Sequence, residues 1–193
     1  MCLVIRKSTL VIFILLYCNF VFSQNSKRNH NSLEGGAIIA GDETIYYGGY
    51  SKYTVPLSQH KHYFTLGISL AAYFDFKGES EPLAYLKNDV DMRLIPTINF
   101  GYSLNFSKVQ FNFEIPVGAS FALTKGTLVN ERAAFEIDYS NNEVFINYGL
   151  LFAPKYKIND VNHIGVYGFL PLIEDKAQSG YQLGIGWTIT FAN

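Results

Sequence analysis

Hydrophobic and polar residues alternate along most of this chain, and most regularly near its end. Between Gly180 and Phe191 every second residue is large and apolar, while small or polar residues stand between them. Strict alternation places the two kinds of side chain on opposite faces of a β-strand. One face therefore suits an apolar medium, and the other suits water or a polar interior.

The same pattern predicts eight strands in the 193 residues. Their approximate ranges are 33–41, 44–57, 62–77, 89–106, 109–123, 143–158, 163–173 and 180–191. Several exceed the roughly five or six residues usual in soluble proteins. They reach the roughly nine to eleven residues that a tilted membrane strand needs. The sequence therefore predicts an all-β fold, an eight-stranded antiparallel up-and-down transmembrane β-barrel.

The two central strands predict a hairpin with a defined register. A two-residue turn after Phe106 pairs that residue with Val109 and sets Phe100 opposite Ile115, so the apolar faces coincide. A slip of one residue destroys this match. The other face is too polar for an ordinary core, and we expect it to line the lumen. It carries Arg93, Thr97, Asn99, Ser103, Asn105, Gln110, Asn112, Glu114 and Ser120.

Charged residues on the presumed inner face need partners, because side chains fill the narrow lumen of an eight-stranded barrel. The register places Glu114 opposite Gly101, which leaves space, and places Arg93 far from Glu114, opposite Ala122. Lys155 lies on the strand that follows that of Glu114, near its periplasmic end. We therefore predict a structural ion pair between Glu114 and Lys155 that plugs the lumen.

The predicted connections are short at one end of the barrel and mostly longer at the other. With the N-terminus in the periplasm, segments 78–88 and 124–142 are the long external loops. Their apolar and charged residues either bind an unknown extracellular ligand or protein, or extend the flanking strands above the membrane. Prolines inside the strands remove ladder donors, so bulges or strand ends must accommodate them. These are Pro56, Pro96, Pro116, Pro154 and Pro171.

The first residues read as an export signal. Arg6 and Lys7 precede an apolar stretch that is short for a membrane-spanning helix, and cleavage is expected near Ser23. The predicted organisation is a signal peptide at 1–23, a flexible lead-in at 24–32 and the barrel domain at 33–193. Both cysteines lie inside the signal, so the mature chain offers no disulfide, thiol catalyst or cysteine metal site.

The chain resembles the porin-like families of small, eight-stranded bacterial outer-membrane barrels. The resemblance is carried by the export signal ending at Ser23-Gln24, by the segment 112–118 (Asn-Phe-Glu-Ile-Pro-Val-Gly) and by the aromatic last strand ending at Phe191. It implies export to the bacterial outer membrane and contact with outer-membrane lipid. It also implies that the barrel-assembly machinery reads the last strand.

Nothing in the sequence points to catalysis, a cofactor or a metal. The net charge of −1 gives no reason to expect nucleic acid as a partner. His30 lies in the lead-in, while His60, His62 and His163 lie in or beside periplasmic turns, where we expect solvated side chains rather than metal ligands.

Two functions follow from the alternation. The favoured one is a non-enzymatic outer-membrane barrel with a structural or loop-mediated binding role. The alternative is a soluble periplasmic lipocalin-like barrel that binds a small apolar ligand, with the apolar face turned inward. Alternation alone does not choose between them, but the strand lengths and the loop pattern favour the membrane.

Overall fold

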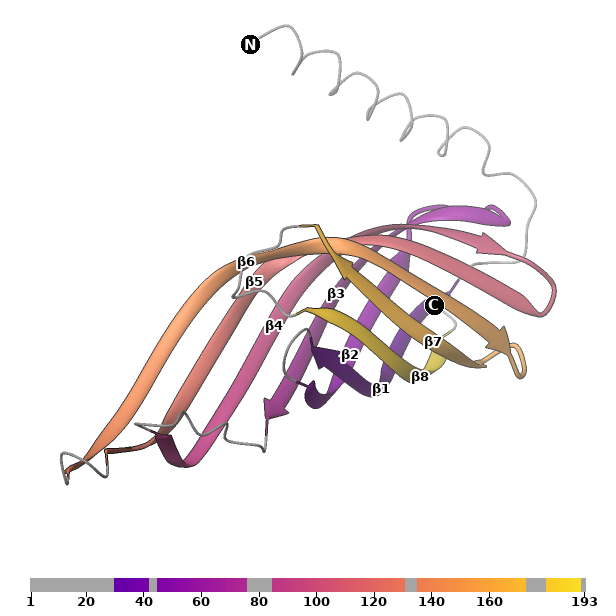
Figure 1. Ribbon diagram of the computed structural model, residues 1–193. Coiled ribbons are helices and arrows are strands. Elements are labelled where there is room, and N and C mark those ends of the chain that lie inside the picture. Colours follow the sequence, from indigo (N-terminus) through magenta and orange to yellow (C-terminus); the bar gives the residue numbers. More distant parts are fainter. Residues whose placement is uncertain (1–29, 42–44, 76–84, 131–134, 173–179, 192–193) are drawn as a thin grey trace, which may run out of the picture.

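The computed structural model describes residues 30–41, 45–75, 85–130, 135–172 and 180–191, and all structural statements concern these. None of them forms a helix long and apolar enough to cross a membrane. The eight strands pair antiparallel in chain order, and the last closes on the first (Figure 1). They are β1 (Asn31–Gly41), β2 (Ile45–Pro56), β3 (His62–Asp75), β4 (Tyr85–Asn105), β5 (Val109–Asn130), β6 (Phe135–Lys157), β7 (Asn162–Pro171) and β8 (Tyr181–Phe191).

The eight-stranded antiparallel barrel predicted from the sequence is thus confirmed, and so is the register of its central hairpin. The backbone N–H of Phe106 donates to the carbonyl of Val109 at 2.8 Å. Phe100 pairs with Ile115, and Gly101 pairs with Glu114. The match of apolar faces was therefore sufficient to fix the pairing of β4 with β5.

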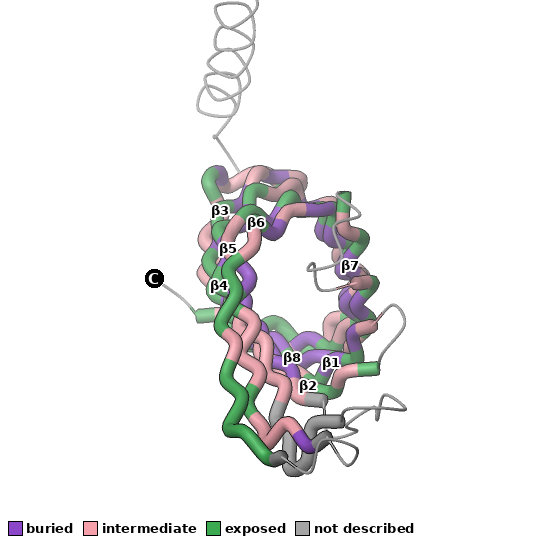
Figure 2. The backbone as a smooth tube through the Cα atoms, turned by 60° about the vertical axis from the view of Figure 1, so that its left-hand side comes forward, coloured by how far each residue is buried: buried purple, intermediate pink, exposed green. Residues whose placement is uncertain are grey.

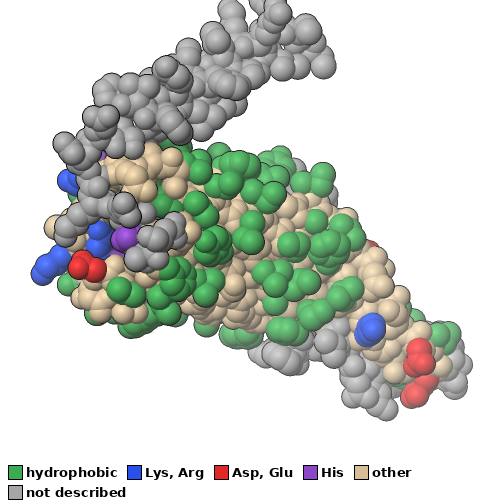
Figure 3. Space-filling view, turned by 180° about the vertical axis from the view of Figure 1, so that it is seen from behind, with side chains coloured by type: hydrophobic (Ala, Val, Ile, Leu, Met, Phe, Trp, Pro, Cys, Tyr) green, Lys and Arg blue, Asp and Glu red, His purple; other side chains and the backbone are tan. Residues whose placement is uncertain are grey.

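The polar side chains face the lumen and the large apolar ones face outward. Asn112 and Gln182 are 4% and 3% exposed, whereas Ile115 and Leu183 are 49% and 67% exposed. Figure 2 shows the closed ring of strands, and Figure 3 shows hydrophobic side chains covering its middle, with charged side chains at both ends. This is the reverse of the arrangement that the lipocalin-like alternative requires.

Two strands that alternate poorly place apolar residues inside. Ile38 of β1 and Tyr167 and Phe169 of β7 are buried in the lumen, where they belong to one hydrophobic cluster. The lumen therefore combines polar groups with an apolar cluster. A strand that contributes to the apolar cluster has apolar residues on its inner face as well as on its outer face. Its sequence therefore does not alternate regularly between apolar and polar residues.

Strands β4, β5 and β6 are much longer than their neighbours. They have 21, 22 and 23 residues, whereas the other strands have 10 to 14. They run on past the barrel at the end opposite the paired Asn31 and Phe191 (Figure 1). We call residues 85–90, 123–130 and 135–145 the protruding sheet.

The protruding sheet changes the predicted external loops. Residues 85–88, 124–130 and 135–142, which lie within the predicted loops 78–88 and 124–142, are strand residues. The backbone groups of β5 are paired there on both sides, by β4 and by β6, so the ladder continues without help from the rest of the barrel. Extension of the flanking strands, one of the two alternatives for these segments, is thus observed; 78–84 and 131–134 lie outside the described residues.

Three prolines lie inside strands, at gaps in the ladder that leave the register unchanged. The β4–β5 pairing stops at Leu94 and resumes at Thr97 in the same register, which spans Pro96. Equivalent gaps span Pro116 and Pro154. Pro56 and Pro171 are the last residues of β2 and β7. The bulges expected from the sequence are therefore unnecessary at the first three, while the other two occupy strand ends as expected.

Candidate functional site

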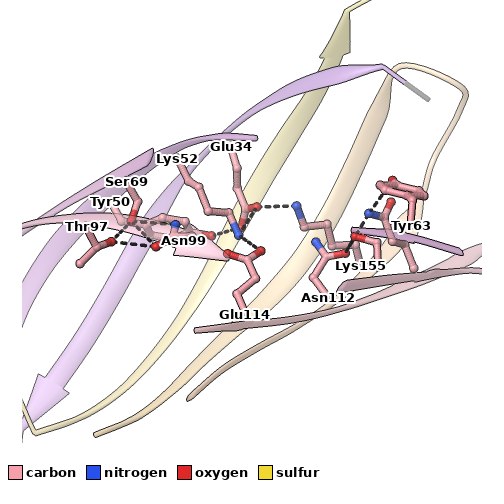
Figure 4. Close-up of polar contacts among 12 residues, drawn as sticks. Glu34, Tyr50, Lys52, Tyr63, Ser69, Thr97, Asn99, Asn112, Glu114 and Lys155 are labelled. Carbon is pink, nitrogen blue, oxygen red and sulfur yellow. Dashed lines mark hydrogen bonds and ion pairs between the residues drawn. The ribbon is translucent and has the colours of Figure 1, made fainter. Parts of the chain in front are cut away.

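Four oppositely charged side chains meet in the lumen of the barrel. Glu34, Lys52, Glu114 and Lys155 come from β1, β2, β5 and β6 and are 3%, 1%, 4% and 4% exposed. Figure 4 shows their heads converging between the strands. We call these four residues the lumen quartet.

The quartet forms an unbroken chain of ion pairs across the barrel. The Lys52 Nζ lies 2.8 Å from the Glu114 Oε1 and 3.4 Å from the Glu34 Oε2. The Lys155 Nζ pairs with the same oxygen of Glu34. The predicted direct pair of Glu114 with Lys155 is therefore corrected: both residues lie in one network, but each is paired with another partner. Glu34 and Lys52, which the prediction left out, stand between them.

Two glycines leave space for the quartet and for the tyrosine that binds it. A Cβ at Gly101 would lie 2.7 Å from the Cγ of Glu114, so only glycine leaves that carboxylate its position. On the far wall a Cβ at Gly186 would lie 2.1 Å from the hydroxyl of Tyr50. That hydroxyl donates to the Glu34 Oε1 at 2.6 Å. The glycines and the charges thus form one packed unit.

Neutral polar groups lie on either side of the quartet. On one side Asn112 accepts hydrogen bonds from Ser103 and Gln110, each at 2.8 Å. On the other side the Thr97 hydroxyl contacts Ser69 at 2.6 Å and donates to Asn99 at 2.8 Å (Figure 4). Buried polar groups are tolerated when they are bonded in this way. The lumen is consequently crossed by several layers of hydrogen bonds.

The quartet carries no net charge, with two carboxylates and two ammonium groups. Each charge is committed to an opposite one within the barrel, which is the condition for keeping charges away from water. The pairs join β2 to β5 and β1 to β6, which are not neighbours in the sheet. The arrangement therefore ties the walls together and fills the space between them.

Glu34 was missed because the first strand alternates poorly, with Ile38 on the same face. A signal was nevertheless present in the pairing of the first two strands. Glu34 lies directly opposite Lys52 in the β1–β2 pairing, so the two side chains share a face.

One expected turn residue is buried instead. His163, which the sequence places beside a turn and in solvent, is 5% exposed and faces the lumen from β7. His62 Nδ1 accepts a hydrogen bond from the backbone N–H of Asn105 at 3.1 Å. Within the described ranges, no three His, Cys, Asp or Glu residues are grouped as metal ligands.

The protruding sheet offers a second candidate site. Its described charged side chains are Lys125, Glu136, Asp138 and Glu143, all exposed, with a net charge of −2 (one cation against three carboxylates). At the edge of the sheet, no described strand pairs with β6 from position 135 to position 145 on the side where β7 pairs further along. This surface therefore combines a free strand edge with an excess of negative charge.

Comparison with solved structures identifies the fold. Ail, the attachment invasion locus protein of Yersinia pestis, matches with a TM-score of 0.54 and 11% identity over 86% of this chain and 100% of that one. Its complex with the heparin analogue sucrose octasulfate matches with the same TM-score and coverages and 13% identity. The N-terminal β-barrel domain of Pseudomonas aeruginosa OprF matches with a TM-score of 0.47 and 16% identity over 84% of this chain and 98% of that domain.

The likeness extends to the fold and no further, because the identities are low. No protein-family model matches the sequence, and the comparison with curated proteins gives no match. The fold is that of the small eight-stranded outer-membrane barrels.

Proposed function

We propose that this chain is a non-enzymatic bacterial outer-membrane barrel that binds an extended, positively charged polypeptide outside the cell through the protruding sheet. The observation that carries the proposal is the edge of β6 from position 135 to position 145, with which no described strand pairs on one side. The rest of the barrel acts as a rigid anchor, with its lumen closed by the quartet.

The outer wall supports a membrane location. Its outward residues are large and apolar, including Ile68 at 62% exposed and Leu183 at 67% exposed. Soluble monomers rarely expose continuous apolar surfaces of such extent. An alternation of apolar-out and polar-in residues is what a membrane barrel requires.

The short connections suggest which end faces the cell surface. Segments 57–61, 106–108 and 158–161 lie at the end that carries the paired Asn31 and Phe191. Short turns are typical of the periplasmic end of such barrels, and longer elements of the outer end. The protruding sheet is then extracellular. Export by the signal at 1–23 and insertion by the barrel-assembly machinery are part of the same proposal.

A free strand edge favours a particular mode of binding. Its unpaired N–H and C=O groups can pair with an added strand from a partner, so an extended segment gains backbone hydrogen bonds whatever its sequence. The side chains that flank the edge then select the partner. Glu136, Asp138 and Glu143 are exposed on β6, which favours a positively charged segment.

The ligand named for Ail does not suit the charge of the protruding sheet. That protein was solved with an analogue of heparin, sucrose octasulfate, which is an anion. The three carboxylates on β6 would repel such a ligand. The proposed partner is therefore of the opposite charge, although the two proteins share a fold.

Catalysis is not part of the proposal. The four charges of the lumen quartet are buried and paired with one another, which favours a structural role for them. The lumen quartet is assigned a structural role, and the charged side chains of the protruding sheet are assigned a binding role.

The proposal is tested with the refolded barrel and a fluorescent peptide of alternating lysine and threonine. Fluorescence anisotropy should show saturable binding, and hydrogen exchange should slow in β6 between positions 135 and 145. Reversing three charges (Glu136→Lys, Asp138→Lys, Glu143→Lys) should weaken binding about tenfold or more, because each exposed pair contributes roughly 0.2–1 kcal/mol.

The matched control is Asp160→Lys, which reverses an exposed charge in a turn at the other end of the barrel. It should leave peptide binding unchanged. Equal binding of an alternating glutamate and threonine peptide, or binding that survives the triple reversal, would contradict the proposed function.

A further inference from the structure

The outer wall of the barrel carries an open groove that crosses several strands. It encloses about 880 Å³ and is lined by side chains from β3 to β8. Its walls and floor follow from the strand register.

Two neighbouring rows of outward side chains form the walls. In the first row each residue pairs with the next across the strands, and its members are Phe64, Tyr102, Phe113, Phe152, Gly168 and Leu183. The second row lies two residues along each strand, toward the protruding sheet, and includes Phe100, Ile115, Leu150, Leu170 and Tyr181.

The floor of the groove is the strand backbone between the two rows. The floor residues Glu114 and Gln182 turn their side chains into the lumen, where they are 4% and 3% exposed. The charge of Glu114 is therefore directed away from the groove. What remains on the outer side is almost entirely hydrocarbon.

The first wall is closed at one end and interrupted near the other. At the β3 end the rings of Phe64 and Tyr102 pack with their centroids 4.9 Å apart, and further along Phe113 and Phe152 pack at 5.0 Å. Next to Phe152 stands Gly168, which adds no side chain to the wall. The first wall therefore has a gap next to β8, whose first residue, Tyr181, lies at the end of the barrel that bears the protruding sheet.

The length and slope of the groove fit one lipid chain. Five spacings between neighbouring strands, at about 4.8 Å each, give a length of about 24 Å. Strands tilted by about 40° make the groove slope by about 50° from the barrel axis, so it rises by about 15 Å. That rise is about half of the 30 Å hydrocarbon core.

We propose that this groove binds one acyl chain of an outer-leaflet lipid, which enters beside Tyr181 and runs down toward β4. The inference rests on the proposed membrane location, because the groove is continuous with the lipid-facing wall. It adds to that proposal a single site where a chain is held by two walls, while elsewhere the wall meets mobile lipid.

Filling the gap at Gly168 tests the site. A Cβ there would lie 3.6 Å from the carbonyl oxygen of Phe152 and 3.9 Å from Leu183, both ordinary contacts, so the backbone accepts a side chain at this position of the wall. The matched control is Ala37→Leu, which adds apolar bulk to an exposed position on β1 that does not line the groove.

The measurement is native mass spectrometry of barrels extracted from outer membranes in mild detergent. Wild type should retain one lipid with the mass of an outer-leaflet species. Gly168→Leu should lower the retained fraction about tenfold, since displacing about two methylene groups weakens binding by that factor. Gly168→Ala should cause a smaller loss, and Ala37→Leu should cause none.

Several results would overturn the inference. These are equal lipid retention in Gly168→Leu and wild type, a bound species with the mass of an inner-leaflet lipid, or a dimer that only Gly168→Leu disrupts. Heat-dependent gel mobility and insertion into vesicles report separately on the barrel. If wild type fails to insert, the membrane proposal itself fails; if all variants insert and retain lipid equally, only the acyl-chain site is rejected.

Discussion

The closed barrel and the protruding sheet are built from the same strands, yet their surroundings differ. Ile98 of β4 is 50% exposed, and Ile137 of β6 is 57% exposed. The neighbours of Ile98, Thr97 and Asn99, are buried in the lumen, whereas the neighbours of Ile137 are exposed carboxylates. Equal exposure therefore does not mean equal surroundings: the first isoleucine belongs to the apolar outer wall of the barrel, and the second lies between two exposed carboxylates on a strand that runs past it.

The two regions also differ in what holds them together. In the barrel every strand has a partner on each side, and buried ion pairs join strands that are not adjacent. In the protruding sheet β6 has a described partner on one side only from position 135 to position 145. Local stability follows such differences in partners and burial. The barrel is thus the anchor, and the sheet is the part free to accept a partner.

The largest effect is expected from Glu34→Ala, which removes the carboxylate shared by two buried lysines. Lys52 would keep Glu114, but Lys155 would lose its only ion-pair partner among the described residues. Leaving a buried charge uncompensated costs about 3–5 kcal/mol. Urea unfolding of the barrel from lipid vesicles, followed by fluorescence of the single Trp187 and by gel mobility, measures this loss.

The control is the same substitution in the other region, Glu136→Ala. Exposed substitutions of this kind change stability by less than about 0.5 kcal/mol. Equal stability of the two variants would show that the lumen is hydrated enough to solvate its charges, and the proposed structural role of the quartet would then be rejected.

A somewhat smaller effect is expected from Ile98→Lys compared with Ile137→Lys. A lysine on the lipid face costs about 2–4 kcal/mol at the middle of the bilayer and about 0–1 kcal/mol near the interface. Ile98→Lys should therefore destabilise the vesicle-bound barrel in urea titrations by the larger amount, and Ile137→Lys by little. Similar small losses at both sites would indicate that water surrounds both, and the proposed membrane location would then be rejected.

The sequence predicted the barrel well because its strongest signal, alternation, is set by the two media on either side of the wall. It placed Glu114 opposite Gly101 and gave the facing of Asn112 and Gln182 correctly. The prediction of strands was less accurate where the two faces of the sheet no longer meet different media. Around Ile137 both faces meet water, so alternation no longer marks a strand, and the segment was predicted to be a loop.

The alternation of apolar and polar residues could not reveal the ion-pair partner of Glu114. Lys52 reaches it from β2 across the lumen, and that distance depends on barrel closure rather than on any hairpin register. Closure also brings Glu34 to Lys155. Sequence patterns fix which residues point inward and which neighbours pair, while contacts across the interior require the shape of the whole ring.

The smallest effect concerns the proline gaps, which lie in the barrel portion of the long strands. At Gly118 an added Cβ would lie 2.0 Å from the carbonyl oxygen of Pro96, a backbone atom that cannot move alone. Gly118→Ala should therefore force β4 and β5 apart, and overpacking of this kind costs about 1–3 kcal/mol in a urea titration. Gly35→Ala is the control, because its Cβ would lie 3.6 Å from the carbonyl oxygen of Tyr50, an ordinary contact. If both variants are equally stable, the backbone near Pro96 adjusts easily to an added Cβ. Gly118 is then not required for the close approach of β4 and β5.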